Sequence, residues 1–96
     1  MRLVFALAAR RDLAEAVAYI SADNPDAARR QRRLIERAAQ RLLDFPGLGR
    51  EDEDGRRRLR VPRTPFVLMY RQHDEMIVIL RVWHGARQDG GLADRA

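Results

Sequence analysis

The sequence contains no cysteine and no lysine, and aromatic residues make up only 6% of its 96 residues. The absence of cysteine excludes disulfide bonds, cysteine-ligated zinc sites and thiol chemistry. Long hydrophobic runs are also missing. The stretch from Leu3 to Ala9 places seven apolar residues between charges, which is too short for a membrane span and short for a signal-peptide core. We therefore expect no membrane association.

The length limits the number of domains. With 46% hydrophobic and 34% charged residues, the 96 residues provide one hydrophobic core and are too apolar for a disordered chain. We expect a single domain over residues 1–96, in which residues 88–96, with Gly90 and Gly91, form a frayed tail.

All 19 basic residues are arginine, and with 14 acidic residues they give a net charge of +5. The arginines are clustered: residues 29–41 hold six arginines and one glutamate, and residues 56–71 hold six arginines and no acid. Guanidinium groups bind phosphates and carboxylates through a bidentate fork and stay charged when partly desolvated. The clusters favour an anionic partner, either a nucleic acid or an acidic protein segment.

The first half of the sequence has the pattern of one strand and two helices. Residues 2–7 alternate as a short strand, and the apolar residues of 9–20 fall on one helical stripe. Asn24 is a good N-cap and Pro25 suits the first position of a second helix, which should run to about Asp44. Two successive amphipathic helices with a short link predict an antiparallel helical hairpin.

The second half has the pattern of a sheet. After an acidic loop at 51–55 the hydrophobic period becomes two, which predicts strands at 58–61, 66–70 and 76–83. A two-residue turn at His73 and Asp74, or a four-residue loop, connects the last two strands. Either connection gives the same register, with the pairs Tyr70–Ile77, Leu68–Ile79 and Phe66–Arg81.

Both faces of this hairpin are apolar, and the two helices can cover only one of them. The order of elements predicts an α+β fold: a two-layer β-α-α-β-β-β domain with an antiparallel helical hairpin packed on one face of a small, mainly antiparallel sheet. An uncovered apolar face is a candidate binding groove. We expect this face to carry Phe66, Leu68, Tyr70, Ile77 and Ile79, with Arg81 nearby.

Few residues are candidates for catalysis. His73 is expected in an exposed turn, whereas His84 ends a buried strand close in sequence to Arg81 and Arg87. A metal-independent ribonuclease needs a base for the 2′-hydroxyl, a donor for the leaving oxygen and cations on the phosphate. His84, Tyr70 and the arginines supply such groups in principle, although a lone histidine at a strand end is more often structural. With two histidines and no cysteine we expect no metal site, and because nucleophile, phosphate-loop and dinucleotide motifs are absent we expect no cofactor.

The order of several short motifs indicates a family. The first half contains Asp12-Leu13 with Tyr19-Ile20, Asn24-Pro25 with Ala27-Ala28, and Leu42-Leu43 with Pro46 and Gly49-Arg50. The second half contains Arg58-Leu59-Arg60-Val61, Pro65-Phe66-Val67-Leu68 with Tyr70-Arg71, and the run from Val78 to Arg87. In this order and spacing the motifs, which extend to about Gln88, resemble the RelE/ParE superfamily of toxins from bacterial type II toxin-antitoxin systems.

The resemblance implies a small cytoplasmic toxin encoded beside a cognate antitoxin. A partly disordered segment of the antitoxin folds over the toxin, and the two form complexes that include larger hetero-oligomers. RelE-like members cleave messenger RNA on the ribosome, whereas ParE-like members have lost the catalytic residues and inhibit DNA gyrase.

The residues favour the ParE-like branch, a binding protein rather than an enzyme. Arg60, Arg81 and His84 match sheet residues that ribonuclease members use. However, Phe66 stands where those members often have an arginine, and no tyrosine follows Tyr70. A RelE-like, ribosome-dependent endoribonuclease is the alternative, and a plain nucleic-acid-binding module is the third possibility. The residues expected to bind the antitoxin or the target are Arg58, Phe66, Leu68, Tyr70, Ile77, Ile79, Trp83 and Arg87.

Overall fold

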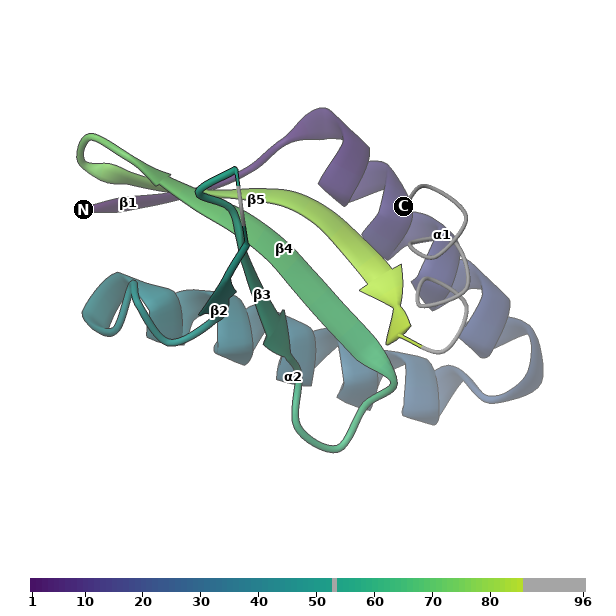
Figure 1. Ribbon diagram of the computed structural model, residues 1–96. Helices are drawn as coiled ribbons and strands as arrows, with labels where there is room; N and C mark the ends of the chain where they lie inside the picture. Colours follow the sequence, from purple (N-terminus) through teal and green to yellow (C-terminus); the bar gives the residue numbers. More distant parts are fainter. Residues whose placement is uncertain (53, 86–96) are drawn as a thin grey trace.

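The computed structural model describes residues 1–52 and 54–85. The chain forms two helices and a five-stranded sheet (Figure 1). The elements are β1 (Arg2–Phe5), α1 (Leu7–Asp23), α2 (Pro25–Asp44), β2 (Arg50–Glu51), β3 (Arg57–Arg60), β4 (Phe66–His73) and β5 (Met76–His84). The expected tail at 88–96 and the candidate Arg87 lie outside the described residues.

The structure confirms the helical hairpin that the sequence predicts. Asn24 caps α2, because its side-chain oxygen accepts a hydrogen bond of 3.0 Å from the backbone N–H of Ala27. Pro25 takes the first helical position, where its missing N–H is not needed. The first helix begins two residues earlier and ends three residues later than expected.

The sheet has the strand order β1-β5-β4-β3-β2. The first strand pairs in parallel with β5, and the other neighbours are antiparallel, so the sheet is mainly antiparallel as expected. The two-residue strand β2, which the sequence did not indicate, adds an edge beside β3. The α+β class and the two-layer arrangement are confirmed, with both helices behind the sheet in Figure 1.

The predicted register of the β4–β5 hairpin is wrong. The turn lies at Asp74 and Glu75, with a positive φ of 53° at Asp74, so His73 pairs with Met76. Tyr70 therefore pairs with Ile79. A bulge then leaves Leu80 without a partner, and the remaining pairs are Met69–Arg81, Leu68–Val82, Val67–Trp83 and Phe66–His84.

The bulge decides which face each side chain of β5 occupies. Side chains alternate along a strand, so one extra residue moves those beyond it to the opposite face. Ile77 and Ile79 point toward the helices, and after the bulge Val82 takes that direction while Arg81 and Trp83 point away.

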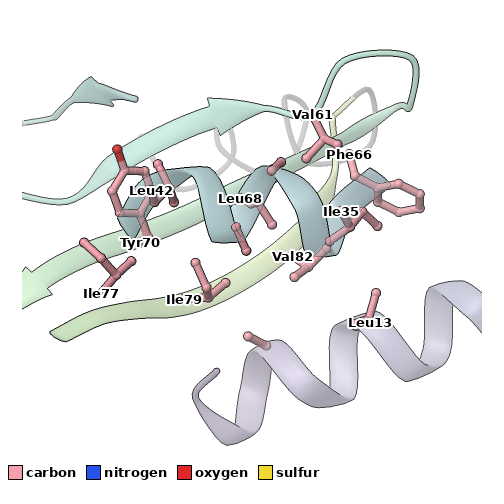
Figure 2. Packing of buried hydrophobic residues seen from close by; sticks show 13 residues of the cluster. Leu13, Ile35, Leu42, Val61, Phe66, Leu68, Tyr70, Ile77, Ile79 and Val82 are labelled. Atoms are coloured by element: carbon pink, nitrogen blue, oxygen red, sulfur yellow. The ribbon is translucent and has the colours of Figure 1, made fainter. Parts of the chain in front are cut away.

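The core lies between this inner face of the sheet and the helices (Figure 2). Leu68, Tyr70, Ile77 and Ile79 are 0% exposed and Phe66 is 5% exposed. These are the five residues that we expected on the uncovered face, so that expectation is wrong. The helices cover the face with the larger side chains, because burying them removes more apolar surface from water. None of the described helices is both long and apolar enough to cross a membrane.

Candidate functional site

The outer face of the sheet is the face turned away from the helices, and the register defines its members. Val67, Met69 and Arg71 alternate with the core residues of β4, and their partners on the neighbouring strands share the same face. The arginines of the outer face are Arg2, Arg50, Arg58, Arg60, Arg71 and Arg81. The strand positions that the structure describes on this face include no acidic residue.

Two of these arginines enclose a tryptophan. The guanidinium carbon of Arg58 lies 5.9 Å from the ring centroid of Trp83, and that of Arg81 lies 5.4 Å from it. Trp83 is 8% exposed and its neighbour Met69 is 4% exposed. The stems of Arg58 and Arg81 contribute to covering Trp83, so this part of the outer face carries cationic groups.

Arg81 is held by Asp12 of α1. Its Nε and Nη2 atoms donate hydrogen bonds of 2.7 and 3.0 Å to the carboxylate, which also accepts one of 3.0 Å from the backbone N–H of Val82. These hydrogen bonds raise the pKa of Arg81, and burial opposes them only partly. Because β1 ends beside Ile79, the edge of β5 is open at Val82, and Asp12 occupies the place of a missing strand there.

A pocket of about 580 Å³ lies between α1 and the end of β5. His84 lines this pocket, and its ring meets the ring of Phe66 edge to face, with centroids 5.7 Å apart. Nδ1 of His84 is buried and has no hydrogen-bond partner among the described residues. The polar residues that line the pocket are Asp12, Glu15, Tyr19, Gln31, Arg81 and His84.

The three candidate catalytic residues come from two strands, β3 and β5. Arg81 and His84 line the pocket, whereas Arg60 is exposed on the outer face of β3, two strands away from β5. The guanidinium of Arg81 is bound to the carboxylate of Asp12 through two hydrogen bonds. A phosphate bound by Arg81, as the ribonuclease hypothesis expects, would have to use the N–H groups that Asp12 does not take.

Tyr70 is removed from the surface. Its hydroxyl accepts a hydrogen bond of 2.8 Å from the backbone N–H of Gly49 and donates one of 2.7 Å to the carbonyl of Pro46. Burial raises the pKa of Tyr70, against the opposing effects of the Gly49 hydrogen bond and the charge of Arg57. The hydroxyl therefore fixes the loop between α2 and β2 and is not available on the outer face.

Of the residues expected to bind a partner, Arg58 and Trp83 remain on the outer face, while the five apolar ones belong to the core. Asp12 is not among the predicted site residues, because its role depends on a contact with Arg81, 69 residues away in the sequence. Arg50, which the register places opposite Arg58, is not among them either. The alternation of Arg58 and Arg60 was the one signal available for this arginine-rich face.

No group of three or more potential metal ligands occurs in the described part of the chain. His73 lies 3.6 Å from the carboxylate of Asp74, and both side chains are exposed in the turn.

Comparisons with known proteins agree with this architecture. Residues 3–89 match the family described as "ParE toxin of type II toxin-antitoxin system, parDE". The protein "Toxin RelE1" of Caulobacter vibrioides is 29% identical over 82 residues, which are 83% of this chain and 88% of that relative. A solved structure titled "Chromosomal ParDE TA system from P. aeruginosa" has a chain with 27% identity and a TM-score of 0.78, and the match covers 88% of this chain and 95% of that one.

Proposed function

Because the chain belongs to the ParE toxin family of type II toxin-antitoxin systems, we propose that it inhibits DNA gyrase and that a cognate antitoxin neutralises it. The observation that carries the first part of this proposal is the state of the candidate catalytic groups. Arg81 is paired with Asp12, and Tyr70 is 0% exposed with its hydroxyl bonded to the loop at 46–49. Two of the groups that a cleavage site would need are therefore engaged in structural contacts, which favours action by binding over cleavage.

The antitoxin proposal rests on the charge of the outer face. No acidic residue occupies a described strand position of this face, although Asp12 of α1 pairs with Arg81. Arg58 and Arg60 are two residues apart on the same side of β3. An acidic, extended or amphipathic segment that orders on binding complements this surface. The structural relative is titled a ParDE toxin-antitoxin system, which supports a partner of this kind.

Supercoiling by purified gyrase tests the gyrase part of the proposal. Relaxed plasmid, ATP and gyrase are incubated with increasing amounts of the purified chain, with and without its antitoxin. We expect the chain to reduce supercoiling and the antitoxin to restore it. Undiminished supercoiling with a folded preparation contradicts gyrase inhibition. A DNA-damage response in cells expressing the chain, rather than an abrupt stop of translation, is the matching result in vivo.

A ribosome-dependent messenger-RNA endoribonuclease is the second candidate. Two observations favour it: the sequence relative is named Toxin RelE1, and the pocket at the end of β5 holds His84 together with Glu15 and Arg81. In this candidate His84 is the general acid or base and Arg81 binds the phosphate. Replacement of His84 by alanine would then abolish cleavage of a transcript on programmed ribosomes. Retention of full toxicity by the His84→Ala variant rejects the candidate.

A further inference from the structure

The loop at residues 45–49, between α2 and β2, is fixed by the sheet beneath it. Tyr70 bonds the N–H of Gly49 and the carbonyl of Pro46, and Arg57 donates a hydrogen bond of 2.8 Å to the carbonyl of Gly49. The N–H of Leu48 donates one of 3.1 Å to the carbonyl of Phe45 within the loop. The backbone of this loop is therefore held in one conformation.

Gly49 shows how closely the loop meets the sheet. A Cβ atom at this position would lie 2.8 Å from the carbonyl oxygen of Arg58 and 2.8 Å from a ring carbon of Tyr70. The neighbouring backbone has no freedom to move away, because Arg58 is paired with Met69 in the sheet. The sequence therefore places glycine where the loop touches two strands.

This immobilised loop carries two exposed hydrophobic side chains. Phe45 is 55% exposed and Leu48 is 43% exposed, and they lie in the same loop, whereas the other exposed large hydrophobic residues, Met1, Leu7 and Tyr19, are far apart in the sequence. The hydrogen bonds hold the backbone that carries both side chains at the surface. A partner that binds to a preordered backbone causes little loss of backbone conformational entropy.

An arginine lies on each side of the pair in the sequence. The guanidinium carbon of Arg41 lies 5.7 Å from the ring centroid of Phe45, and the exposed Arg50 follows the loop directly. Two carboxylates are near: Glu51 is paired with Arg57 at 3.4 Å, and Asp44 is the last residue of α2. An apolar centre with arginines at its rim is the composition of binding hot spots on protein surfaces.

We infer that Phe45 and Leu48 are a preformed binding surface for the protein that this toxin attacks. Their side chains insert into an apolar pocket, bordered by carboxylates, on that protein. The inference rests on the proposed function and adds the part of the surface that engages the target. The antitoxin is proposed to lie over the outer face, and the loop leads into β2 at the edge of that face. A segment across the outer face hinders the approach of a large target to the loop.

The test compares a double variant, Phe45→Ser with Leu48→Ser, with the control Leu7→Ser. Leu7 is 55% exposed on α1 and has the same exposure as Phe45. Growth arrest in cells, inhibition of gyrase and affinity for the antitoxin are measured for each protein, with thermal unfolding as a check of the fold. We expect the double variant to need at least about tenfold more protein for half-inhibition, and the control to stay within about threefold.

The outcomes separate this inference from the proposed function. If the wild type inhibits gyrase and the double variant inhibits it equally, the inference is wrong and the gyrase proposal stands. If the wild type arrests growth without inhibiting gyrase, the gyrase proposal fails. In that case, loss of growth arrest by the double variant supports the inference, and retention of arrest overturns it. A double variant that loses affinity for the antitoxin alone overturns it, and a wild type that does not arrest growth overturns both.

Discussion

The two faces of strand β4 differ in what they contribute to the protein. On the inner face Leu68 and Tyr70 are 0% exposed and pack against the helices. On the outer face Val67, Met69 and Arg71 lie among arginines from the neighbouring strands. Adjacent residues of one strand therefore contribute to the core and to the proposed recognition surface separately, and a substitution at one position should leave the other property almost unchanged.

The largest expected effect is on the inner face. Leu68→Ala removes a fully buried side chain from the core and should lower the free energy of unfolding by about 2–5 kcal/mol. Val67→Ala, one residue away on the outer face and half-buried, should cost about 1 kcal/mol or less. Urea unfolding of both variants measures the difference. Equal losses would show that the outer face is covered as well as the inner one.

The second-largest expected effect on stability comes from removing the hydroxyl of Tyr70. Tyr70→Phe leaves the N–H of Gly49 and the carbonyl of Pro46 without their partner, which should cost about 1–3 kcal/mol. Amide hydrogen exchange at Gly49 should become faster in this variant. Tyr19→Phe is the control, because Tyr19 is 78% exposed. An unchanged exchange rate at Gly49 would mean that the loop is fixed by other contacts.

The contact between α1 and β5 is expected to contribute less to the free energy of unfolding. Asp12→Ala breaks the pair with Arg81 and frees the N–H of Val82, and we expect a loss of about 1–2 kcal/mol in unfolding free energy. The value is moderate because the side chain of Arg81 is 40% exposed, which weakens the ion pair through solvent screening. Thermal unfolding at low and high salt checks it. A variant as stable as the wild type would remove the structural role given to Asp12.

The smallest expected effect is on the stability of the protein at low pH. Partial burial raises the pKa of Asp52. The pKa is lowered more strongly by hydrogen bonds from the backbone N–H groups of Asp54 and Arg56 and by the charges of Arg56 and Arg58. The net result is a pKa below the usual 3.8. A lowered carboxylate pKa adds stability above the unfolded pKa, and this stability is lost as the pH falls through the folded value. Between pH 5 and 3 the wild type should therefore lose more stability than Asp52→Asn. Parallel pH curves for the two proteins would contradict this.

Local signals in the sequence were sufficient for the elements of the fold. The cap at Asn24, the proline at 25 and the change of hydrophobic period after the acidic loop identify the boundary between the helices and the three strands β3, β4 and β5. The strand β2 gave no signal, because two residues, Arg50 and Glu51, are too few to show an alternation.

The faces of the sheet were not predictable in the same way. Both sets of alternating residues in β4 are apolar, so the pattern does not say which set meets the helices. The bulge at Leu80 then reverses the alternation within β5, and nothing in the local sequence marks it. As a result, Arg81 was placed with Ile77 and Ile79, while it lies with Trp83 on the opposite face.

The proposed division between the two layers of the molecule is tested most directly by the affinity of the antitoxin for two charge-matched variants. One replaces Arg50, Arg58 and Arg60 of the outer face by glutamine, and the other replaces the exposed Arg30, Arg33 and Arg37 of α2. In titration calorimetry, the outer-face variant should bind at least about tenfold more weakly, and the helix variant should stay within about threefold of the wild type. Weaker binding by the helix variant, with the outer-face variant unchanged, would contradict the account.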